Sequence, residues 1–141
     1  MVGQLMFLVD TNVWLELLLE QEKADEVREF FLHIESQFLT ITEFSLYSIG
    51  IILTRLRKHD LLNDFFSDTI EDSGVSIVRL NVSDLKQISD ICKEYKLDFD
   101  DAYQYVASMK YDMTLVSFDN DFKRMERRSK TPAMIISENG A

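Results

Sequence analysis

Short apolar runs alternate with longer amphipathic stretches along the 141-residue chain. The runs have the length of buried strands, and the stretches between them repeat apolar residues at helical spacing. The predicted strands cover residues 5–9, 37–41, 75–80, 113–118 and 133–136. The predicted helices cover residues 13–20, 22–35, 43–57, 59–72, 84–95 and 100–111, with a short helix near 120–127. Strands that alternate with helices predict an α/β fold, in which helices enclose a mainly parallel sheet.

Few residues interrupt this pattern. The chain has one proline and four glycines, and no repeat or flexible linker divides it. We therefore expect a single domain over residues 1–141, long enough to bury one sizeable core. Gly74 is the expected C-cap of the helix 59–72, and Ser83 is the expected N-cap of the helix 84–95.

The chain is acidic, with a formal net charge of −10. This charge argues against non-specific duplex binding, which needs a basic face to neutralise phosphates. It does not argue against an enzyme that holds metal ions with acids, because the metal changes the local field. Cys92 is the only cysteine, and the N-terminal apolar run is too short for a signal or membrane segment. We therefore expect a cytoplasmic protein.

Four acids occupy equivalent places in the predicted elements. Asp10 and Asp119 follow apolar strands, while Glu43 and Asp101 lie in the first turns of helices. Ligands of parallel sheets bind beyond the carboxyl ends of the strands, which is where these acids should meet. Carboxylates gathered there repel one another unless a cation such as Mg²⁺ or Mn²⁺ lies between them. We therefore expect some of them to have raised pKa values without metal.

Helix capping is the alternative explanation for each of these acids. Aspartate is a preferred N-cap, and any acid near a helix start interacts favourably with the helix dipole. The stretch Thr40–Glu43 also fits a capping box, with Glu43 as its third helical residue. Serine, threonine or asparagine would cap equally well, however. Capping alone therefore does not account for four acids in corresponding positions.

Other kinds of site find little support. His33 and His59 lie on different predicted helices, so a histidine-based zinc site is not expected. Ser117 is not in a sharp glycine-flanked turn and is better interpreted as a hydroxyl at a strand end. The basic cluster after Asp119 fits either a solvated helix face or a surface that contacts a phosphodiester backbone. Its residues are Lys123, Arg124, Arg127, Arg128 and Lys130.

Four motifs together resemble the PIN-domain nucleases, in particular the VapC toxins of prokaryotic toxin–antitoxin pairs. VDTNVWLELL carries Asp10, and LTITEFSLYSI carries Glu43 at the start of an apolar helix. LDFDDAYQYVAS carries Asp101, and LVSFDNDF carries Asp119 two residues after the hydroxyl residue Ser117. No single motif is specific, but all four occur in the family's order and cover nearly the whole chain.

The resemblance implies a three-layer α/β/α sandwich and Mg²⁺- or Mn²⁺-dependent hydrolysis of RNA. It assigns Asp10, Glu43, Asp101 and Asp119 to metal binding and catalysis, with Asp121 as an accessory ligand. Asn12 and Ser117 would orient the acids. It also implies a homodimer, and a small antitoxin whose C-terminal segment covers the active site.

Three other functions are weighed against this one. A haloacid-dehalogenase-like phosphotransfer enzyme needs a second aspartate two residues after the first, where this chain has Asn12. A receiver-like protein needs paired early acids and a late lysine, and is also disfavoured. A PIN-like binding or scaffold protein without catalysis remains as the alternative, although it would have no reason to keep four mutually repelling acids.

Overall fold

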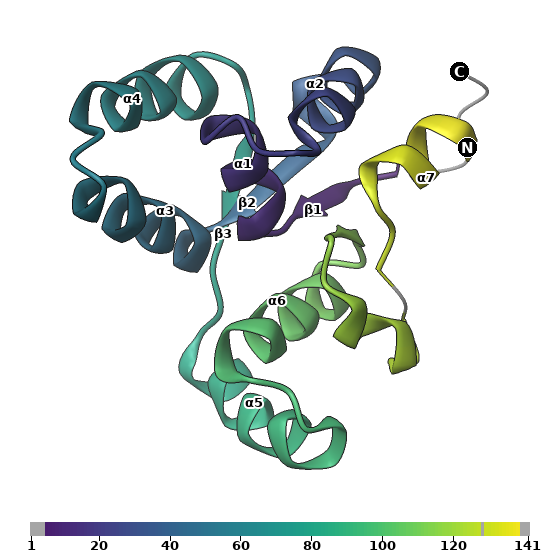
Figure 1. Ribbon diagram of the computed structural model, residues 1–141. Helices are drawn as coiled ribbons and strands as arrows, with labels where there is room; N and C mark the ends of the chain where they lie inside the picture. Colours follow the sequence, from purple (N-terminus) through teal and green to yellow (C-terminus); the bar gives the residue numbers. More distant parts are fainter. Residues whose placement is uncertain (1–4, 128, 139–141) are drawn as a thin grey trace.

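Figure 1 shows a computed structural model of the chain, which describes residues 5–127 and 129–138. In chain order its elements are β1 (Phe7–Val9), α1 (Thr11–Leu18), α2 (Ala24–His33), the 3₁₀ helix η1 (Ser36–Phe38), β2 (Leu39–Thr42), α3 (Glu43–Arg55), α4 (His59–Asp64), the π-helix η2 (Phe65–Glu71), β3 (Ser76–Val78), α5 (Val82–Tyr95), α6 (Phe99–Lys110), β4 (Thr114–Val116), the 3₁₀ helix η3 (Asn120–Arg124) and α7 (Pro132–Glu138). Within these residues, no helix has both the length and the apolar character needed to cross a bilayer.

The four strands form one parallel sheet in the order β3-β2-β1-β4. The chain builds the sheet outward from β1 in both directions, so β1 and β4 are neighbours although about a hundred residues separate them. Leu8 of β1 is in register with Leu115 of β4. This arrangement places the ends of β1 and β4 side by side, at the point of a parallel sheet where ligands commonly bind.

Each face of the sheet has its own apolar core. Phe7 and Val9 pack with residues of α1, α2 and α3, whereas Leu8 packs with residues of α5 and α6. This alternation follows from the two-residue period of a strand. Figure 1 shows the first group of helices on one side of the sheet and α5 and α6 on the other. The predicted three-layer α/β/α sandwich is therefore confirmed.

The strand predicted at residues 133–136 is wrong, because these residues lie in helix α7. Pro132 is the first residue of that helix, a position where its missing N–H is not needed. The hydroxyl of Thr131 accepts a hydrogen bond from the Met134 backbone, as an N-cap does (3.2 Å). Ile135 is buried in the core that Phe7 and Val9 share with α1, α2 and α3. An apolar run this short fits a strand or a helix equally well.

Other predicted boundaries are also corrected. The helix expected over 59–72 is divided into α4 and η2, and Gly74 beyond it has the expected positive φ of 93°. The short helix near 120–127 is the 3₁₀ helix η3. Thr42, not Thr40, caps α3, since its hydroxyl accepts from the Ser45 backbone (3.0 Å). Glu43 is therefore the first helical residue, and the capping-box interpretation of Glu43 is wrong.

Asn81 caps α5 in place of the predicted Ser83. The Asn81 side chain accepts from the Asp84 backbone (3.0 Å), and the Asp84 carboxylate accepts from the Asn81 backbone (2.9 Å). Loss of such a cap typically costs about 1 kcal/mol. We expect Asn81→Ala to lower the free energy of unfolding by about this amount in a urea titration. Ser83→Ala is the control, and an equal loss in both variants would contradict the assignment of the cap.

Candidate functional site

A cavity of about 450 Å³ opens beyond the ends of β1 and β4. Residues of α1, α3, α6 and the segment after β4 form its walls. Six aspartates are among its lining residues, namely Asp10, Asp98, Asp100, Asp101, Asp119 and Asp121. Four of the five acids predicted for the site are therefore brought together here from segments far apart in the sequence, namely Asp10, Asp101, Asp119 and Asp121.

Asp10 forms the floor of this cavity and is only 5% exposed. It caps α1, and one carboxylate oxygen accepts from the Thr11 backbone (2.8 Å) and from Gln104 Nε2 (3.0 Å). The other oxygen accepts from Ser117 Oγ (2.8 Å), with Asn12 Nδ2 at 3.5 Å. These donors fix the orientation of a carboxylate that burial alone would drive towards the neutral form.

Asp101 lies in the first turn of α6 and is shared by two groups of acids. It forms one group with Asp119 and Asp121, and another with Asp98 and Asp100. Within each group, one carboxylate oxygen per residue lies within 4.8 Å of the others. Like charges at this separation repel strongly unless a proton or a cation intervenes.

The pKa values reflect this crowding. Burial, followed by the charges of Asp119, Asp100 and Asp10, raises the pKa of Asp101 from 3.8 to about 8. A hydrogen bond with Asp119 also favours the protonated form. Burial raises the pKa of Asp10 too, against the opposing effect of its hydrogen-bond donors. The direction agrees with the prediction that clustering raises the pKa of some of these acids. The charges of neighbouring aspartates contribute substantially at Asp101, whereas at Asp10 the charge of Asp119 is the smallest contribution.

Asn12 and Ser117 connect the ends of β1 and β4, as expected of residues that orient the acids. Ser117 Oγ accepts from the Asp119 backbone (3.0 Å) while it donates to Asp10. The amide of Asn12 donates to Ser117 Oγ (3.2 Å) and accepts from the Phe118 backbone (3.2 Å). The two residues thereby hold Asp10 and Asp119 in a fixed relation.

Glu43 is not brought into this cluster. It is half-buried at the start of α3, and it neither lines the cavity nor joins either acidic group among the described residues. Helix α3 instead contributes Ser45, which is fully buried. Ser45 Oγ lies 2.7 Å from Thr11 Oγ1 and accepts from Gln104 Nε2 at 2.6 Å. The role of Glu43 in metal binding stays a prediction.

Sequence reasoning missed Gln104. Its side chain is buried between Asp10 and Ser45, and Nε2 donates to both. Its carbonyl oxygen has no hydrogen-bond partner among the described residues. The available signal was its spacing, because Gln104 follows Asp101 by three residues and therefore lies on the same face of α6. A neutral amide attracts less attention than an acid, although it fixes the orientation of one here.

The basic cluster has a largely structural arrangement. Arg124 donates to the backbone oxygens of Tyr95 (2.6 Å) and Lys96 (3.2 Å) and pairs with Asp121. Arg127 pairs with Asp112 at 3.0 Å. Lys123 lines a small cavity of about 140 Å³ together with Asp119. Arg128 lies outside the described residues. Lys123 and Arg124 are thus the predicted contacts for nucleic acid that lie near cavity acids, Lys123 near Asp119 and Arg124 paired with Asp121.

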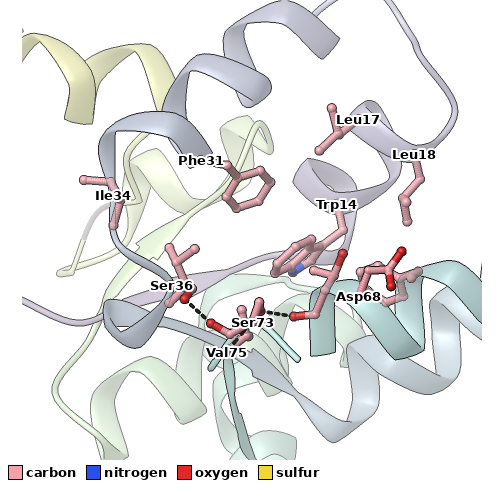
Figure 2. Close-up of a pocket in the computed structure, with 12 residues that line it drawn as sticks. Trp14, Leu17, Leu18, Phe31, Ile34, Ser36, Asp68, Ser73 and Val75 are labelled. Carbon is pink, nitrogen blue, oxygen red and sulfur yellow. Dashed lines mark hydrogen bonds between the residues drawn. The ribbon is translucent and has the colours of Figure 1, made fainter. Parts of the chain in front are cut away.

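A second cavity, of about 310 Å³, lies between α1, α2 and η2 and has a different chemistry (Figure 2). Trp14 and Phe31 stack within it, with ring centroids 4.8 Å apart. Asp68 is the one acid among its lining residues. Ser73 closes one end through hydrogen bonds with Ser36 and Thr69. This cavity suits an apolar group and lacks a set of ligands for a cation.

The residues of the first cavity fit a divalent cation. All six acids offer carboxylate oxygens, which are the ligands that Mg²⁺ and Mn²⁺ prefer. After burial, the charges of Asp119, Asp100 and Asp10 contribute to the raised pKa of Asp101, so these carboxylates repel one another. A cation between the carboxylates would remove that repulsion.

The fold is shared with several solved structures. VapC20 from Mycobacterium tuberculosis, described as a sarcin-ricin loop cleaving toxin, has a TM-score of 0.73 at 16% identity, covering 86% of this chain and 95% of that one. FitAcB from Neisseria gonorrhoeae has a TM-score of 0.70 at 17% identity, covering 90% and 98%. A toxin–antitoxin complex from Klebsiella pneumoniae has a TM-score of 0.69 at 17% identity, covering 89% and 96%.

Sequence comparison gives two further results. No curated protein sequence matches the chain. The family profile described as the PIN domain matches residues 7–128. This match spans most of the chain and includes all six aspartates of the cavity. The protein therefore belongs to the PIN domain family.

Proposed function

We propose that this PIN-domain protein is an endoribonuclease that hydrolyses RNA phosphodiester bonds with Mg²⁺ or Mn²⁺. The observation that carries the proposal is the cluster of six aspartates at the ends of β1 and β4. Burial, together with the charges of Asp119, Asp100 and Asp10, raises the pKa of Asp101 to about 8. A fold that needed these residues only as caps would not have to gather them around one cavity.

Asp101, Asp119 and Asp121 are the proposed ligands, since their oxygens already lie within 4.8 Å of one another. Asp10 borders the same cavity as a further ligand, and Asp98 and Asp100 extend the negative charge to one side. A bound divalent cation supplies an activated water near neutral pH and stabilises charge on a phosphate. Carboxylates from several elements would fix its position relative to the substrate.

The buried network around Asp10 supplies rigidity. Four donors hold the Asp10 carboxylate, and Gln104 in turn is tied to Ser45 on α3. A site whose ligands are held in advance does not have to reorganise during the reaction. Asp10 therefore serves as a preorganised carboxylate, whereas the half-exposed Asp101 and Asp119 face the substrate side.

RNA and an antitoxin are the proposed partners. VapC20 is described as a toxin that cleaves the sarcin-ricin loop, and other proteins of the same fold were solved as toxin–antitoxin complexes. We extend both properties to this chain, as the toxin of a VapBC-type pair acting on RNA in the cytoplasm. The exposed Tyr47 and Ile51 of α3 (63% and 53% exposed) offer an apolar surface for the proposed homodimer.

Cleavage of fluorogenic RNAs tests this proposal. The wild-type protein should cut at least one RNA of a panel in Mg²⁺ or Mn²⁺, and EDTA should stop the reaction. Calorimetry with Mn²⁺ provides a reading that does not depend on the choice of RNA. Absence of both cleavage and Mn²⁺ binding would overturn the proposal and favour a PIN-like binding or scaffold protein.

Gln104 and Glu43 are expected to differ in importance. Gln104→Met removes the donor that orients Asp10, and loss of such a supporting contact typically lowers metal affinity or activity roughly 10- to 100-fold. Glu43→Gln changes a carboxylate outside the cavity, so we expect a smaller loss. Initial cleavage rates and Mn²⁺ titrations of both variants make the comparison. If Glu43→Gln caused the larger loss, α3 would have to bring that carboxylate into the site.

A further inference from the structure

Three aromatic rings lie together at the edge of the acidic cavity. The centroid of the Phe44 ring is 5.1 Å from that of Tyr103 and 6.0 Å from that of Phe99, and the last two are 6.4 Å apart. Phe44 lines the cavity. Phe99 is not among its lining residues, although its sequence neighbours Asp98 and Asp100 are. Phe44 therefore belongs to the cavity wall, and the rings of Phe99 and Tyr103 extend the aromatic surface outward from it.

The three rings are not equally needed by the fold. Tyr103 is buried, and its hydroxyl accepts a hydrogen bond from the Leu80 backbone (3.1 Å). Phe44 is half-buried and packs against the core that Leu8 shares with α5 and α6. Phe99 is 52% exposed although it is the first residue of α6, where a polar residue would serve equally well. The cluster thus has a buried base and an exposed outer ring.

An RNA strand that reaches this cavity meets a strongly negative surface. Six aspartates line the cavity; one of them, Asp121, pairs with Arg124, whereas Arg127 pairs with Asp112, which is not among the lining residues. A bound cation offsets part of this charge near the reacting phosphate only. Stacking of a base on an aromatic ring does not depend on charge, and it is a common source of affinity for single strands.

We propose that Phe99, supported by Phe44, forms a stacking subsite for one unpaired nucleobase next to the scissile phosphate. This inference rests on the proposed ribonuclease activity and narrows its substrate to RNA that is single-stranded at the cut. A base within a duplex is already stacked on both faces and cannot lie on an aromatic side chain without leaving the helix. The subsite selects for an exposed base and tolerates its identity, because every base has an aromatic face.

The test places 2-aminopurine, a fluorescent base that is quenched by stacking, at successive positions of a short single-stranded RNA. In Mg²⁺, the wild-type protein should quench the fluorescence of the probe at one position of the RNA. Cleavage of the same RNAs is followed in parallel. Phe99→Ala and Phe99→Leu should lose this quenching and raise KM about 5- to 30-fold with little change in kcat, as expected for one lost stacking contact. Phe99→Trp should retain both properties. Phe66→Ala is the matched control, since Phe66 is also partly exposed (38%) but packs against Phe65 on η2, whereas Phe99 packs against Phe44, which lines the acidic cavity.

An abasic substitution at the quenched position completes a double-mutant cycle. It should weaken cleavage by wild type but cause no further loss in Phe99→Ala, because both changes remove the same contact. If wild type cleaves RNA and Phe99→Ala has an unchanged KM without a change in quenching, the stacking subsite is overturned while the nuclease stands. If quenching depends on Phe99 but no variant cleaves, the subsite stands and the proposed activity falls.

Discussion

Asp101→Asn is expected to lower kcat/KM for RNA cleavage by about 10²–10³-fold, the loss found when one group that stabilises transition-state charge is removed. Asp101 is shared by both groups of acids, so its replacement weakens the proposed cation site from two sides at once. Asparagine keeps the size of the side chain, and the change therefore tests charge and cation binding with little disturbance of packing.

Asp90→Asn is the matched control for this experiment. Asp90 is exposed on α5 and does not line the acidic cavity, so the variant makes the same Asp-to-Asn change in a chain of net charge −10 without altering the site. Cleavage should follow the wild type in Asp90→Asn and be lost in Asp101→Asn. Mn²⁺ titration by calorimetry should weaken in the same order. Cleavage by Asp101→Asn at the wild-type rate would show that Asp101 is not part of the active site.

The acids at the strand ends were predictable because a parallel sheet leaves few alternatives. A buried strand that ends in Asp10 and another that ends near Asp119 must direct these residues to the same edge once the strands are neighbours. Asp101 followed from its position at a helix start. The sequence therefore predicted the three layers and most of the acidic cluster, and the motifs carried the family resemblance.

Helix registers were less predictable. Thr40 and Thr42 are both acceptable N-caps, and only the structure decides between them. If the cap is two residues later, a given residue such as Glu43 lies two positions nearer the helix start. Its direction relative to that start differs by about 200°, at roughly 100° per residue. With Thr42 as the cap, Ser45 reaches the buried network and Glu43 does not line the cavity. Gln104 was missed for another reason, because a neutral amide attracts less attention than an acid. The strand predicted in α7 reflects an apolar run that is too short to distinguish a strand from a helix.

The second large effect concerns the pH dependence of stability. The substitution Asp101→Asn, which should lower activity, should raise the stability of the cation-free protein. In the folded, cation-free protein the pKa of Asp101 is about 8, against an ordinary value of 3.8. The folded state therefore holds a proton that the unfolded state releases between about pH 4 and pH 8. The stabilisation is complete below the lower value, and it is lost as pH rises through the upper one. The raised pKa of Asp10 acts in the same direction.

We therefore expect Asp101→Asn to raise the melting temperature of the protein in EDTA at pH 9, and to raise it about half as much at pH 6, because the stabilisation of the wild type is lost steadily between the two pKa values. Because Asp101 is only half-buried, solvent screening limits the gain to about 1 kcal/mol, or roughly 4 °C. Asp90→Asn measures the effect of removing one negative charge elsewhere, and the difference between the two variants cancels the titration of all other groups. Adding Mn²⁺ at pH 9 should reverse the order of the melting temperatures of wild type and Asp101→Asn, because the wild type then gains the free energy of cation binding that Asp101→Asn has lost.

Equal melting temperatures for the two variants in EDTA at both pH values would mean that the carboxylates of the cavity do not repel one another. That result would remove the physical basis for placing a cation between them.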